Sequence, residues 1–212
     1  MLKLLLGTNN YGKVYEYQSL LSSLPFKIVT LADQSITTIV NEDGANLEEN
    51  ARAKASVLAA ESQLLTLADD SGLEVDALGG MPGVISARYA GEGASNKERI
   101  TYLLAQLENV PWKRRMACFR CVVAIATPDG EAVFCSSVCR GFITLEPKGE
   151  LGFGYDPIFY LPEIGKTMAE LPAATKNQVS HRGQAARKAR QILERLAAGG
   201  DIMEGNTHDW SF

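Results

Sequence analysis

The sequence predicts an α/β protein built around a mixed β-sheet, and three observations lead to that class. Short apolar runs such as residues 2–7 alternate with helix-like segments in the first half of the chain, as is typical of parallel strands covered by helices. Two longer strand-like runs, 116–126 and 132–144, lie on either side of a Pro-Asp-Gly turn at residues 128–130 and predict an antiparallel hairpin. With 212 residues, of which 46% are hydrophobic, the chain can bury a sizeable core.

The first elements follow from side-chain patterns. Residues 2–7 are continuously apolar, as expected for a strand covered on both faces. The polar loop at residues 8–13 leads into a helix, and a second strand is expected at residues 26–31. The apolar stripe of the helix after the residue 8–13 loop comprises Val14, Tyr17, Leu20, Leu21 and Leu24.

A second helix is predicted from residue 47 to about residue 62, because Asn46 and Glu49 resemble a capping box. Its buried face comprises Leu47, Ala51, Ala55 and Leu58. A buried strand at residues 64–68 then ends in a turn at residues 69–72, since Asp, Ser and Gly are turn formers, and an alternating pattern resumes afterwards.

In the second half, Ser95 is expected to cap a helix. The short run Trp112-Lys113-Arg114-Arg115 predicts a solvated basic corner, and a basic helix is predicted from Gln184 to about Leu196. We expect residues 1–198 to form one domain and residues 199–212 a poorly ordered tail, whose His208 has no role. The apolar positions of the helix after Ser95 include Ile100, Leu103, Leu104 and Leu107.

Composition argues against several classes of partner. A net charge of -4 does not favour a broad nucleic-acid surface, which needs clustered Lys and Arg. No apolar run approaches the roughly 20 residues of a membrane span. The first residues lack the features of a signal peptide, so a soluble cytoplasmic protein is expected.

The four cysteines raise the possibility of a zinc site. Cys118 and Cys121 have the C-x-x-C spacing, and Cys135 and Cys139 follow. Both pairs lie in strand-like runs without a glycine knuckle, and strand alternation directs Cys118 and Cys121 to opposite faces. Buried, reduced thiols are therefore the preferred interpretation.

The loop at residues 8–13 has the form of an anion site. A strand, a small polar loop and a helix N-terminus leave backbone N–H groups and the positive end of the helix dipole facing outward. Lys13 adds a full positive charge in the first turn, where a cation is unfavourable unless an anion lies beside it. An ordinary strand-to-helix turn remains the alternative.

Acidic residues provide a second candidate group. Asp69 and Asp70 repel each other and are costly to bury, so their position favours use by a cation or a proton transfer, with a solvated turn as the alternative. Glu42 lies ahead of the helix cap and can act as a ligand. Asn50 and Lys54 share a helix face, which is either solvated or directs Lys54 toward an anion.

The second half adds an aromatic and further donors. Glycines on either side of Phe153 allow a sharp turn that presents its ring, either for stacking on a flat ligand or as a buried loop aromatic. Lys176 and the pair His181 and Arg182 add positive charge and donors. Together with the carboxylates, which suit Mg²⁺, these features fit a purine nucleoside triphosphate bound with Mg²⁺.

Four motifs in order carry a resemblance to a known family. They are Thr8-Asn9-Asn10-Tyr11-Gly12-Lys13, Asp69-Asp70-Ser71-Gly72, Gly152-Phe153-Gly154-Tyr155-Asp156 and Ser180-His181-Arg182-Gly183. Over roughly residues 1–197 the chain resembles the inosine triphosphate pyrophosphatase (Ham1/RdgB-like) family. The resemblance implies a two-lobed α/β fold around a long twisted mixed sheet, a homodimer, and Mg²⁺-dependent hydrolysis of dITP, ITP and XTP to the monophosphate and pyrophosphate.

The resemblance also implies roles by position. Asp70 is the expected proton acceptor and a metal ligand, Glu42 is the other metal ligand, and Asp69 supports the site. The expected substrate-binding residues are Thr8, Asn9, Asn10, Tyr11, Gly12, Lys13, Lys54, Ser71, Phe153, Gly154, Tyr155, Asp156, Lys176, His181 and Arg182.

The types of residue in these motifs suggest a mechanism, and other functions remain possible. Asp70 would accept a proton from a water that attacks the α-phosphorus. Donors such as His181 or Arg182 suit the 6-carbonyl of hypoxanthine and xanthine and would oppose the 6-amino group of adenine. A Maf-like pyrimidine nucleotide pyrophosphatase and a non-catalytic nucleotide sensor remain open, whereas an aspartyl phosphatase is disfavoured because the D-x-D spacing is lacking.

Overall fold

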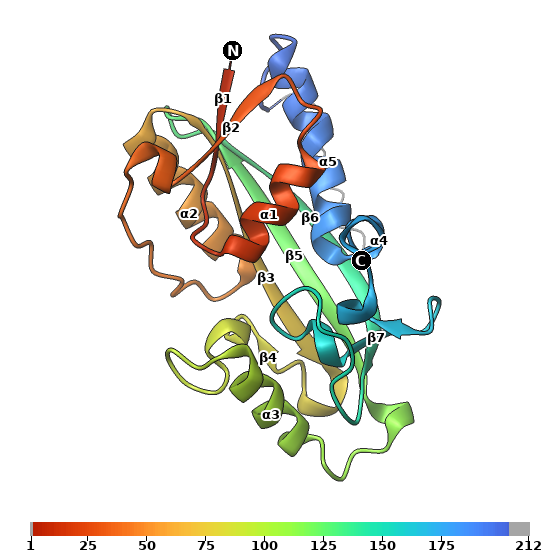
Figure 1. Ribbon diagram of the computed structural model, residues 1–212. Helices are drawn as coiled ribbons and strands as arrows, with labels where there is room; N and C mark the ends of the chain where they lie inside the picture. The colour runs from red at the N-terminus through yellow and green to blue at the C-terminus, as the bar shows by residue number, and fades with distance from the viewer. Residues whose placement is uncertain (1, 204–212) are drawn as a thin grey trace. The chain divides into compact units, whose positions relative to one another are not determined.

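The computed structural model describes residues 2–203, and the fold of this part is mixed α/β, as predicted (Figure 1). Its eight strands form one sheet in the order β2-β1-β3-β5-β6-β7-β8, with β4 paired to β3. The strands are β1 (Leu2–Leu6), β2 (Phe26–Thr30), β3 (Leu65–Val75), β4 (Pro82–Gly83), β5 (Met116–Ala126), β6 (Ala132–Ile143), β7 (Phe159–Leu161) and β8 (Lys166–Thr167). The α-helices are α1 (Tyr11–Leu20), α2 (Leu47–Ser62), α3 (Asn96–Gln106), α4 (Ala173–Val179) and α5 (His181–Ala197).

The sheet is mixed, as the sequence predicts. β1 pairs in parallel with β2 and β3, whereas β7 pairs antiparallel with β6 and β8. The predicted hairpin of β5 and β6 is also confirmed, because the N–H of Thr127 donates to the carbonyl of Glu131 across the turn. A connection this short requires antiparallel strands.

The chain divides into two compact units, in agreement with the expected two-lobed fold. The first unit takes in the chain up to Asp70, then Val122–Cys135, and the chain from Ala186 onward. The second unit comprises Ser71–Cys121 and Ser136–Ala185. Each of the long strands β3, β5 and β6 contributes residues to both units.

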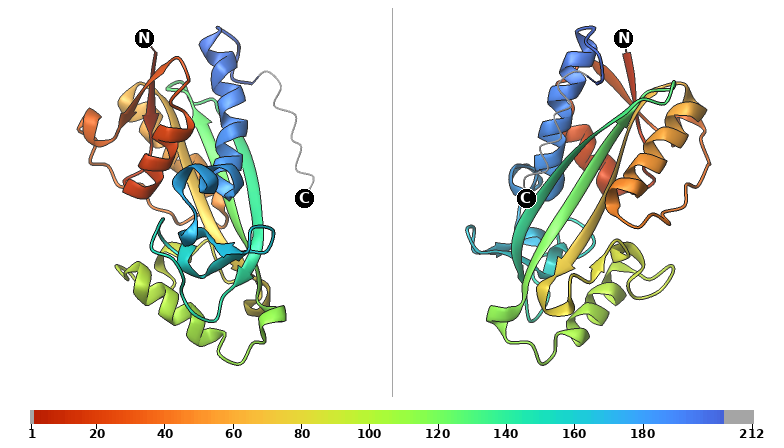
Figure 2. Two further views of the ribbon diagram at one scale, coloured as in Figure 1. Left: turned by 45° about the vertical axis from the view of Figure 1, so that its right-hand side comes forward. Right: turned by 180° about the vertical axis from the view of Figure 1, so that it is seen from behind.

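In the first unit, helices cover both faces of β1 and its neighbours. α1 and the later part of α5 lie on one face, and α2 lies on the other (Figures 1 and 2). The Arg190 guanidinium on α5 donates to the Ser23 hydroxyl just beyond α1, at 2.6 Å. Residues 4–6 of β1 have no exposed surface, which confirms a strand covered on both faces.

Helix starts follow the predicted caps. The Asn46 side chain accepts the N–H of Glu49 at the start of α2, and Ser95 forms a full capping box with Glu98 at the start of α3. In α2 the Glu49 carboxylate accepts the N–H of Ala45. These short-range hydrogen bonds explain why the starts of α2 and α3 could be predicted from local sequence.

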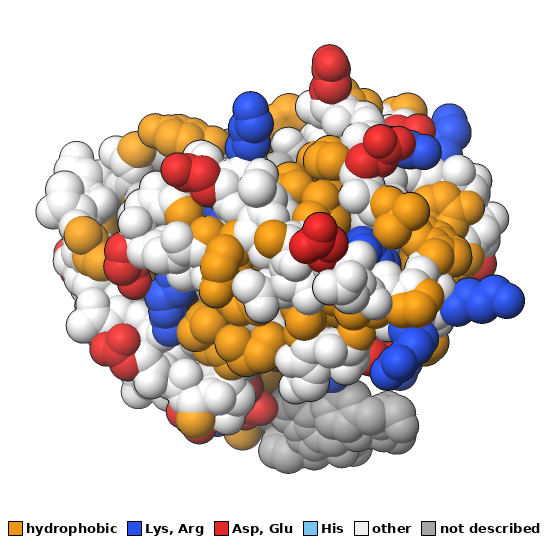
Figure 3. All heavy atoms as spheres, turned by 90° about the horizontal axis from the view of Figure 1, so that it is seen from below, with side chains coloured by type: hydrophobic (Ala, Val, Ile, Leu, Met, Phe, Trp, Pro, Cys, Tyr) orange, Lys and Arg blue, Asp and Glu red, His pale blue; other side chains and the backbone are white. Residues whose placement is uncertain are grey.

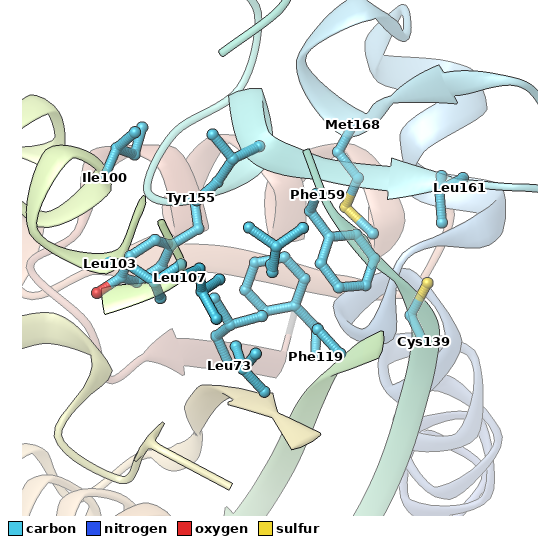
Figure 4. Close-up of a cluster of buried hydrophobic side chains, with 14 of the residues drawn as sticks. Leu73, Ile100, Leu103, Leu107, Phe119, Cys139, Tyr155, Phe159, Leu161 and Met168 are labelled. Carbon is cyan, nitrogen blue, oxygen red and sulfur yellow. The ribbon is translucent and has the colours of Figure 1, made fainter. Parts of the chain in front are cut away.

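The second unit has its own apolar core. Side chains from α3, β3, β5 and β7 meet there, and Figure 4 shows Phe119 and Phe159 packed side by side within it. Their ring centroids lie 4.6 Å apart. The buried members are Leu73, Val75, Ile100, Leu103, Leu107, Ala117, Phe119, Cys139, Ile143, Tyr155, Ile158, Phe159, Leu161, Met168 and Leu171.

The predicted turn at residues 69–72 is wrong. β3 is one strand of 11 residues, Leu65–Val75, which runs through both aspartates and on into the second unit. The turn-forming tendency of Asp, Ser and Gly is overridden by the sheet, in which β3 pairs with β5 as well as with β1 at residues 65–67 and β4 at residues 73–74. The structure therefore places the two carboxylates in the middle of a strand.

Two smaller predictions also fail. α5 begins at His181 rather than Gln184, because Ser180 ends the preceding helix and its hydroxyl accepts the N–H of Gly183. Arg115 is not part of a solvated corner; it is buried, and its guanidinium donates to the carbonyls of Leu107, Val110 and Thr144.

The predicted tail lies largely outside the described residues, as does His208. Of the tail residues that the structure describes, Ile202 is buried. Within residues 2–203, no helix combines the length and the apolar character that crossing a membrane demands.

Candidate functional site

The loop at residues 8–13 takes the predicted form at the start of α1. The Asn10 side chain caps the helix by accepting the N–H of Lys13, and the Thr8 hydroxyl accepts the N–H of Asn10. Asn9, Asn10 and Tyr11 are exposed to solvent. The loop thus presents a capped helix N-terminus, the arrangement suited to an anion.

Parallel pairing brings this loop to the aspartates. Leu6 of β1 is in register with Leu67 of β3, and the N–H of Gly7 donates to the Leu67 carbonyl at 2.7 Å. The residues just beyond these on the two strands are therefore neighbours. Consistent with this, the Lys13 ammonium lies 3.0 Å from Oδ1 of Asp69 and 3.3 Å from its carbonyl oxygen.

Asp70 belongs to a different group of side chains. Its Oδ2 accepts a hydrogen bond from the Asn50 amide at 3.0 Å, and its Oδ1 lies 3.5 Å from the Lys54 ammonium. Lys54 also contacts Oε1 of Glu42 at 2.5 Å. Successive side chains of a strand point to opposite faces, which is why Asp69 meets a lysine of α1 and Asp70 a lysine of α2.

The predicted face of α2 is therefore buried, not solvated. Asn50 and Lys54, one turn apart, are both buried and both contact Asp70. The side-chain Oδ1 of Asn50 also accepts the N–H of Gly44, which ties the loop after Glu42 to the helix. Sequence reasoning gave Asn50 no role, although its spacing from Lys54 could have indicated one.

Burial and charge set the ionisation of this group. Burial raises the pKa of Asp70 above its ordinary value, and the nearby ammonium groups of Lys54 and Lys13 offset only part of this. Burial alone would lower the pKa of Lys54, but the carboxylates of Asp70, Glu42 and Asp69 raise it by more. Lys54 therefore carries its charge, while Asp70 is an unusually basic carboxylate.

The donor set of the first unit fits a magnesium ion. Glu42 and Asp70 both direct an oxygen to the same ammonium, so the two carboxylates are close together. The group has three carboxylates and only two ammonium groups, so its net charge is one negative. A bound divalent cation would make this net charge positive, which favours binding of a polyphosphate. The residues are Glu42, Asp69, Asp70, Lys13 and Lys54. Among the described residues no cluster of three His, Cys, Asp or Glu side chains is placed to hold a metal ion. Mg²⁺ is commonly bound by one or two carboxylates together with waters and substrate oxygens, and Glu42 and Asp70 are carboxylates of this kind.

The glycine-flanked loop of the second unit is built around Asp156. Its Oδ2 accepts the N–H of Phe153 at 2.8 Å and contacts the Lys176 ammonium at 2.5 Å. Gly152 has a φ of +75°, and a Cβ there would lie 2.1 Å from that carboxylate oxygen. Only glycine fits at this position, which explains one of the two glycines beside Phe153.

Two cations lie against the Phe153 ring. The Lys176 ammonium is 4.6 Å and the Arg182 guanidinium carbon 5.4 Å from the ring centroid, both within cation–π range. Lys176, an expected substrate-binding residue, thus belongs to the same group as the aromatic. The Arg182 guanidinium also donates to the Ser71 hydroxyl at 3.1 Å.

His181 and Tyr155 are both buried in the second unit. The His181 ring stacks on Phe119, and the Tyr155 hydroxyl donates to the Ser86 carbonyl at 2.9 Å. The Tyr155 side chain therefore anchors its loop, and a substrate contact from this residue stays a prediction.

The structure brings the predicted residues into two groups, one in each unit. The acid and lysine group of the first unit comprises Thr8, Asn9, Asn10, Tyr11, Gly12, Lys13, Glu42, Lys54, Asp69 and Asp70, to which the structure adds Asn50. The aromatic and cation group of the second unit comprises Ser71, Phe153, Gly154, Tyr155, Asp156, Lys176, His181 and Arg182.

Similar proteins are known at the level of sequence. A model described as the Ham1 family matches residues 4–192. The dITP/XTP pyrophosphatase of Desulforamulus reducens is 50% identical over 195 residues, which cover 92% of this chain and 97% of that protein. The dITP/XTP pyrophosphatase of Geobacter sulfurreducens is 50% identical over 185 residues, or 87% of this chain and 93% of that protein.

Solved structures agree with the sequence relatives. A HAM1 protein from Coxiella burnetii superposes with a TM-score of 0.82 at 42% identity, covering 91% of this chain and 98% of that one. The Ham1 protein of Staphylococcus aureus gives a TM-score of 0.81 at 38% identity, covering 92% of this chain and 99% of that one. With sequence and fold in agreement over nearly their whole lengths, the chain belongs to the Ham1 family.

Proposed function

We propose that this protein is a dITP/XTP pyrophosphatase, a hydrolase of nucleotide metabolism that converts dITP, ITP and XTP to the monophosphate and pyrophosphate. Both bacterial relatives described above carry this name, and the chain spans nearly their whole length. Residues 1–198 would form the catalytic domain. Membership of the Ham1 family favours purine substrates over the pyrimidine substrates of a Maf-like enzyme.

The observation that carries the proposal is the environment of Asp70. Its carboxylate is buried and held between the Asn50 amide and the Lys54 ammonium, which fixes its position for accepting a proton from a water. In the proposed reaction Asp70 takes a proton from the water that attacks the α-phosphorus, and pyrophosphate leaves whole. A nucleotide sensor has no need of such a base.

Each group of side chains would handle one part of the substrate. Lys13, Lys54 and the N–H groups of the residue 8–13 loop bind phosphate oxygens, exchanging part of their contact with Asp69 and Glu42 for contact with the substrate. Glu42 and Asp70 would hold Mg²⁺, which when bound offsets the charge of the triphosphate and of departing pyrophosphate.

The base would be recognised by the aromatic and cation group. The Phe153 ring offers a stacking face, with Lys176 and Arg182 beside it. Donors of His181 or Arg182 would pair with the 6-carbonyl of hypoxanthine or xanthine, and adenine would set donor against donor. Asp156 orients Phe153 and Lys176 at once.

A panel of dITP, XTP, dGTP, ATP and dTTP with Mg²⁺ tests the proposal, scoring monophosphate and pyrophosphate. We expect a strong preference for dITP and XTP, and a loss of roughly 100-fold or more in kcat for Asp70→Asn, as for removal of a general base. Glu74→Gln is the matched control, because Glu74 lies on the same strand and binds Arg120 instead. Equal turnover of ATP, or an active Asp70→Asn, contradicts the proposal.

The site of attack can be tested separately in water enriched in ¹⁸O. Attack at the α-phosphorus places the label in the monophosphate, whereas attack at the β-phosphorus places it in pyrophosphate. We expect the label in the monophosphate alone. Label in free phosphate would instead indicate a phosphatase.

We further propose that the protein is a homodimer. The second unit exposes large apolar side chains, among them Tyr102, Trp112, Met116 and Leu145, and Figure 3 shows apolar side chains gathered between charged ones on one face. Sedimentation of the purified protein over a range of concentrations should give twice the chain mass of 23.0 kDa. A monomer at all concentrations contradicts this part of the proposal.

A further inference from the structure

The side chain of His181 is buried and stacked on an aromatic ring, although the residue begins a helix. It begins α5, yet only 4% of its surface is exposed. Its imidazole lies nearly parallel to the Phe119 ring, with centroids 4.5 Å apart and an angle of 13° between the planes. Stacking at this distance covers one face of the imidazole and fixes the plane in which its two nitrogens lie.

Phe119 is itself immobilised. It lies on β5, is buried, and packs its ring against Phe159 of β7 at 4.6 Å (Figure 4). Phe159 has no exposed surface. The platform under the imidazole is thus part of the apolar core of the second unit, and it moves only if that core repacks.

The backbone of His181 is fixed by a neighbouring strand. Its N–H donates a hydrogen bond to the sulfur of Cys139 on β6. Burial raises the pKa of the Cys139 thiol to about 12, so the group stays protonated and chemically inert. Backbone and ring of the first residue of α5 are therefore both held by the sheet.

From this arrangement we infer that Phe119 is a positioning residue for base selection, acting through the imidazole of His181. The inference rests on the proposed function, in which a donor of His181 or Arg182 meets the 6-carbonyl of the base. A hydrogen bond requires its donor in line with the acceptor, and an imidazole free to tilt would meet a 6-carbonyl and a 6-amino group with less discrimination. Phe119 removes that tilt.

Phe119→Leu tests the inference, with KM and kcat measured for dITP and dATP. We expect KM for dITP to rise about threefold to tenfold, as for one weakened hydrogen bond, with little change in kcat. A merely structural defect would behave in the opposite way, since a smaller folded fraction lowers apparent kcat and leaves KM unchanged. Phe119→Tyr keeps the ring face and should return KM toward the wild-type value.

A double-mutant cycle with His181→Ala decides whether Phe119 acts through the imidazole. In the His181→Ala background, Phe119→Leu should leave KM for dITP unchanged. Leu103→Ala is the matched control, because Leu103 is a buried member of the same core and lies on α3. Phe119→Met, which fills a similar volume, replaces Phe119→Leu if that variant does not fold.

The inference is overturned if KM is unaffected, if the effect persists without the imidazole, or if Leu103→Ala reproduces it. Failure of the proposed function looks different. In that case the wild-type protein itself shows no preference for dITP over dATP, whatever residue occupies position 119.

Discussion

At the scale of single residues, the two adjacent aspartates have separate environments. Asp69 pairs with Lys13 of α1, whereas Asp70 contacts Asn50 and Lys54 of α2. Strand alternation separates the two charges and gives each its own cation, so their mutual repulsion is reduced. The same alternation leaves Asp70 beside Glu42 as the candidate for metal and water chemistry.

Asp70 should weaken the folded state at neutral pH. Burial raises its pKa, so its ionised form is less favourable in the folded than in the unfolded chain, and the folded state gains stability as the pH falls toward the ordinary value for an aspartate. We therefore expect Asp70→Asn to melt at a higher temperature than the wild type at pH 7 in EDTA. The difference should shrink as the pH is lowered toward 4.

Glu74→Gln is the control, and its expected change in melting temperature at pH 7 has the opposite sign. Burial raises the pKa of Glu74, but hydrogen bonds from Arg120 and Cys118 lower it by more, so the net shift is downward. Its contribution is present above the ordinary pKa of a glutamate and is lost as the pH falls through the folded value. Glu74→Gln should melt below the wild type at pH 7, and matching shifts of the same sign in both variants would refute the assignment.

Magnesium should stabilise the protein through the same carboxylates. Binding to the folded state alone raises the melting temperature with increasing metal concentration. We expect Mg²⁺ to raise the melting temperature of the wild type, and Glu42→Gln to lose most of this shift, because one of the two carboxylates that share Lys54 is removed. Differential scanning fluorimetry measures the melting temperatures. If Mg²⁺ raises the melting temperature of Glu42→Gln as much as that of the wild type, the ion binds elsewhere.

At the scale of elements, short contacts between α4 and α5 orient the residues that would meet the base. α5 starts two residues after α4 ends, and a Cβ at Gly183 would lie 1.9 Å from the Asn177 carbonyl oxygen. The two helices can meet this closely only at a glycine. The close approach accounts for Gly183 in the Ser-His-Arg-Gly motif, which carries His181 and Arg182 on the first turn.

Gly183→Ala should therefore force the two helices apart. Overpacking against backbone costs about 1–3 kcal/mol, and the displaced first turn should also raise KM for dITP. Gln191→Ala, an exposed position on the same helix, should change neither quantity. Urea unfolding and steady-state kinetics measure both, and a Gly183→Ala protein with wild-type stability would show that α5 tolerates the extra carbon.

At the scale of the whole molecule, the two units share strands. β3, β5 and β6 each contribute residues to both, and β3 passes from one to the other between Asp70 and Ser71. Neither unit can lose its part of the sheet without breaking strands that continue into the other. We therefore predict that the two units do not fold independently.

A single cooperative unfolding transition should result. Calorimetry in EDTA is expected to give one peak, with a calorimetric enthalpy equal to the van't Hoff enthalpy per cooperative unit. Phe119→Leu, in the core of the second unit, should lower the temperature of the whole transition. Two resolved peaks, or a variant that shifts only part of the transition, would show independent units.

Much of the fold was predictable because it depends on neighbours in the sequence. The predicted helix caps at Asn46 and Ser95 are contacts within three residues, and the turn between β5 and β6 is equally local. The apolar run of β1 indicates burial on both faces without knowledge of its partners. The residue types of the site likewise indicated a polyanion with Mg²⁺ before any geometry was known.

The sequence by itself thus determined the family and most of the helices and strands, and it predicted the chemistry of the ligand. Only the tertiary structure decided that β3 continues through Asp69 and Asp70, that Asn50 holds Asp70, and that Lys176 lies against the Phe153 ring. The reason is that each of these depends on partners distant in the chain. A strand continues where neighbouring strands pair with it, and once it continues, alternation fixes which cation each carboxylate meets.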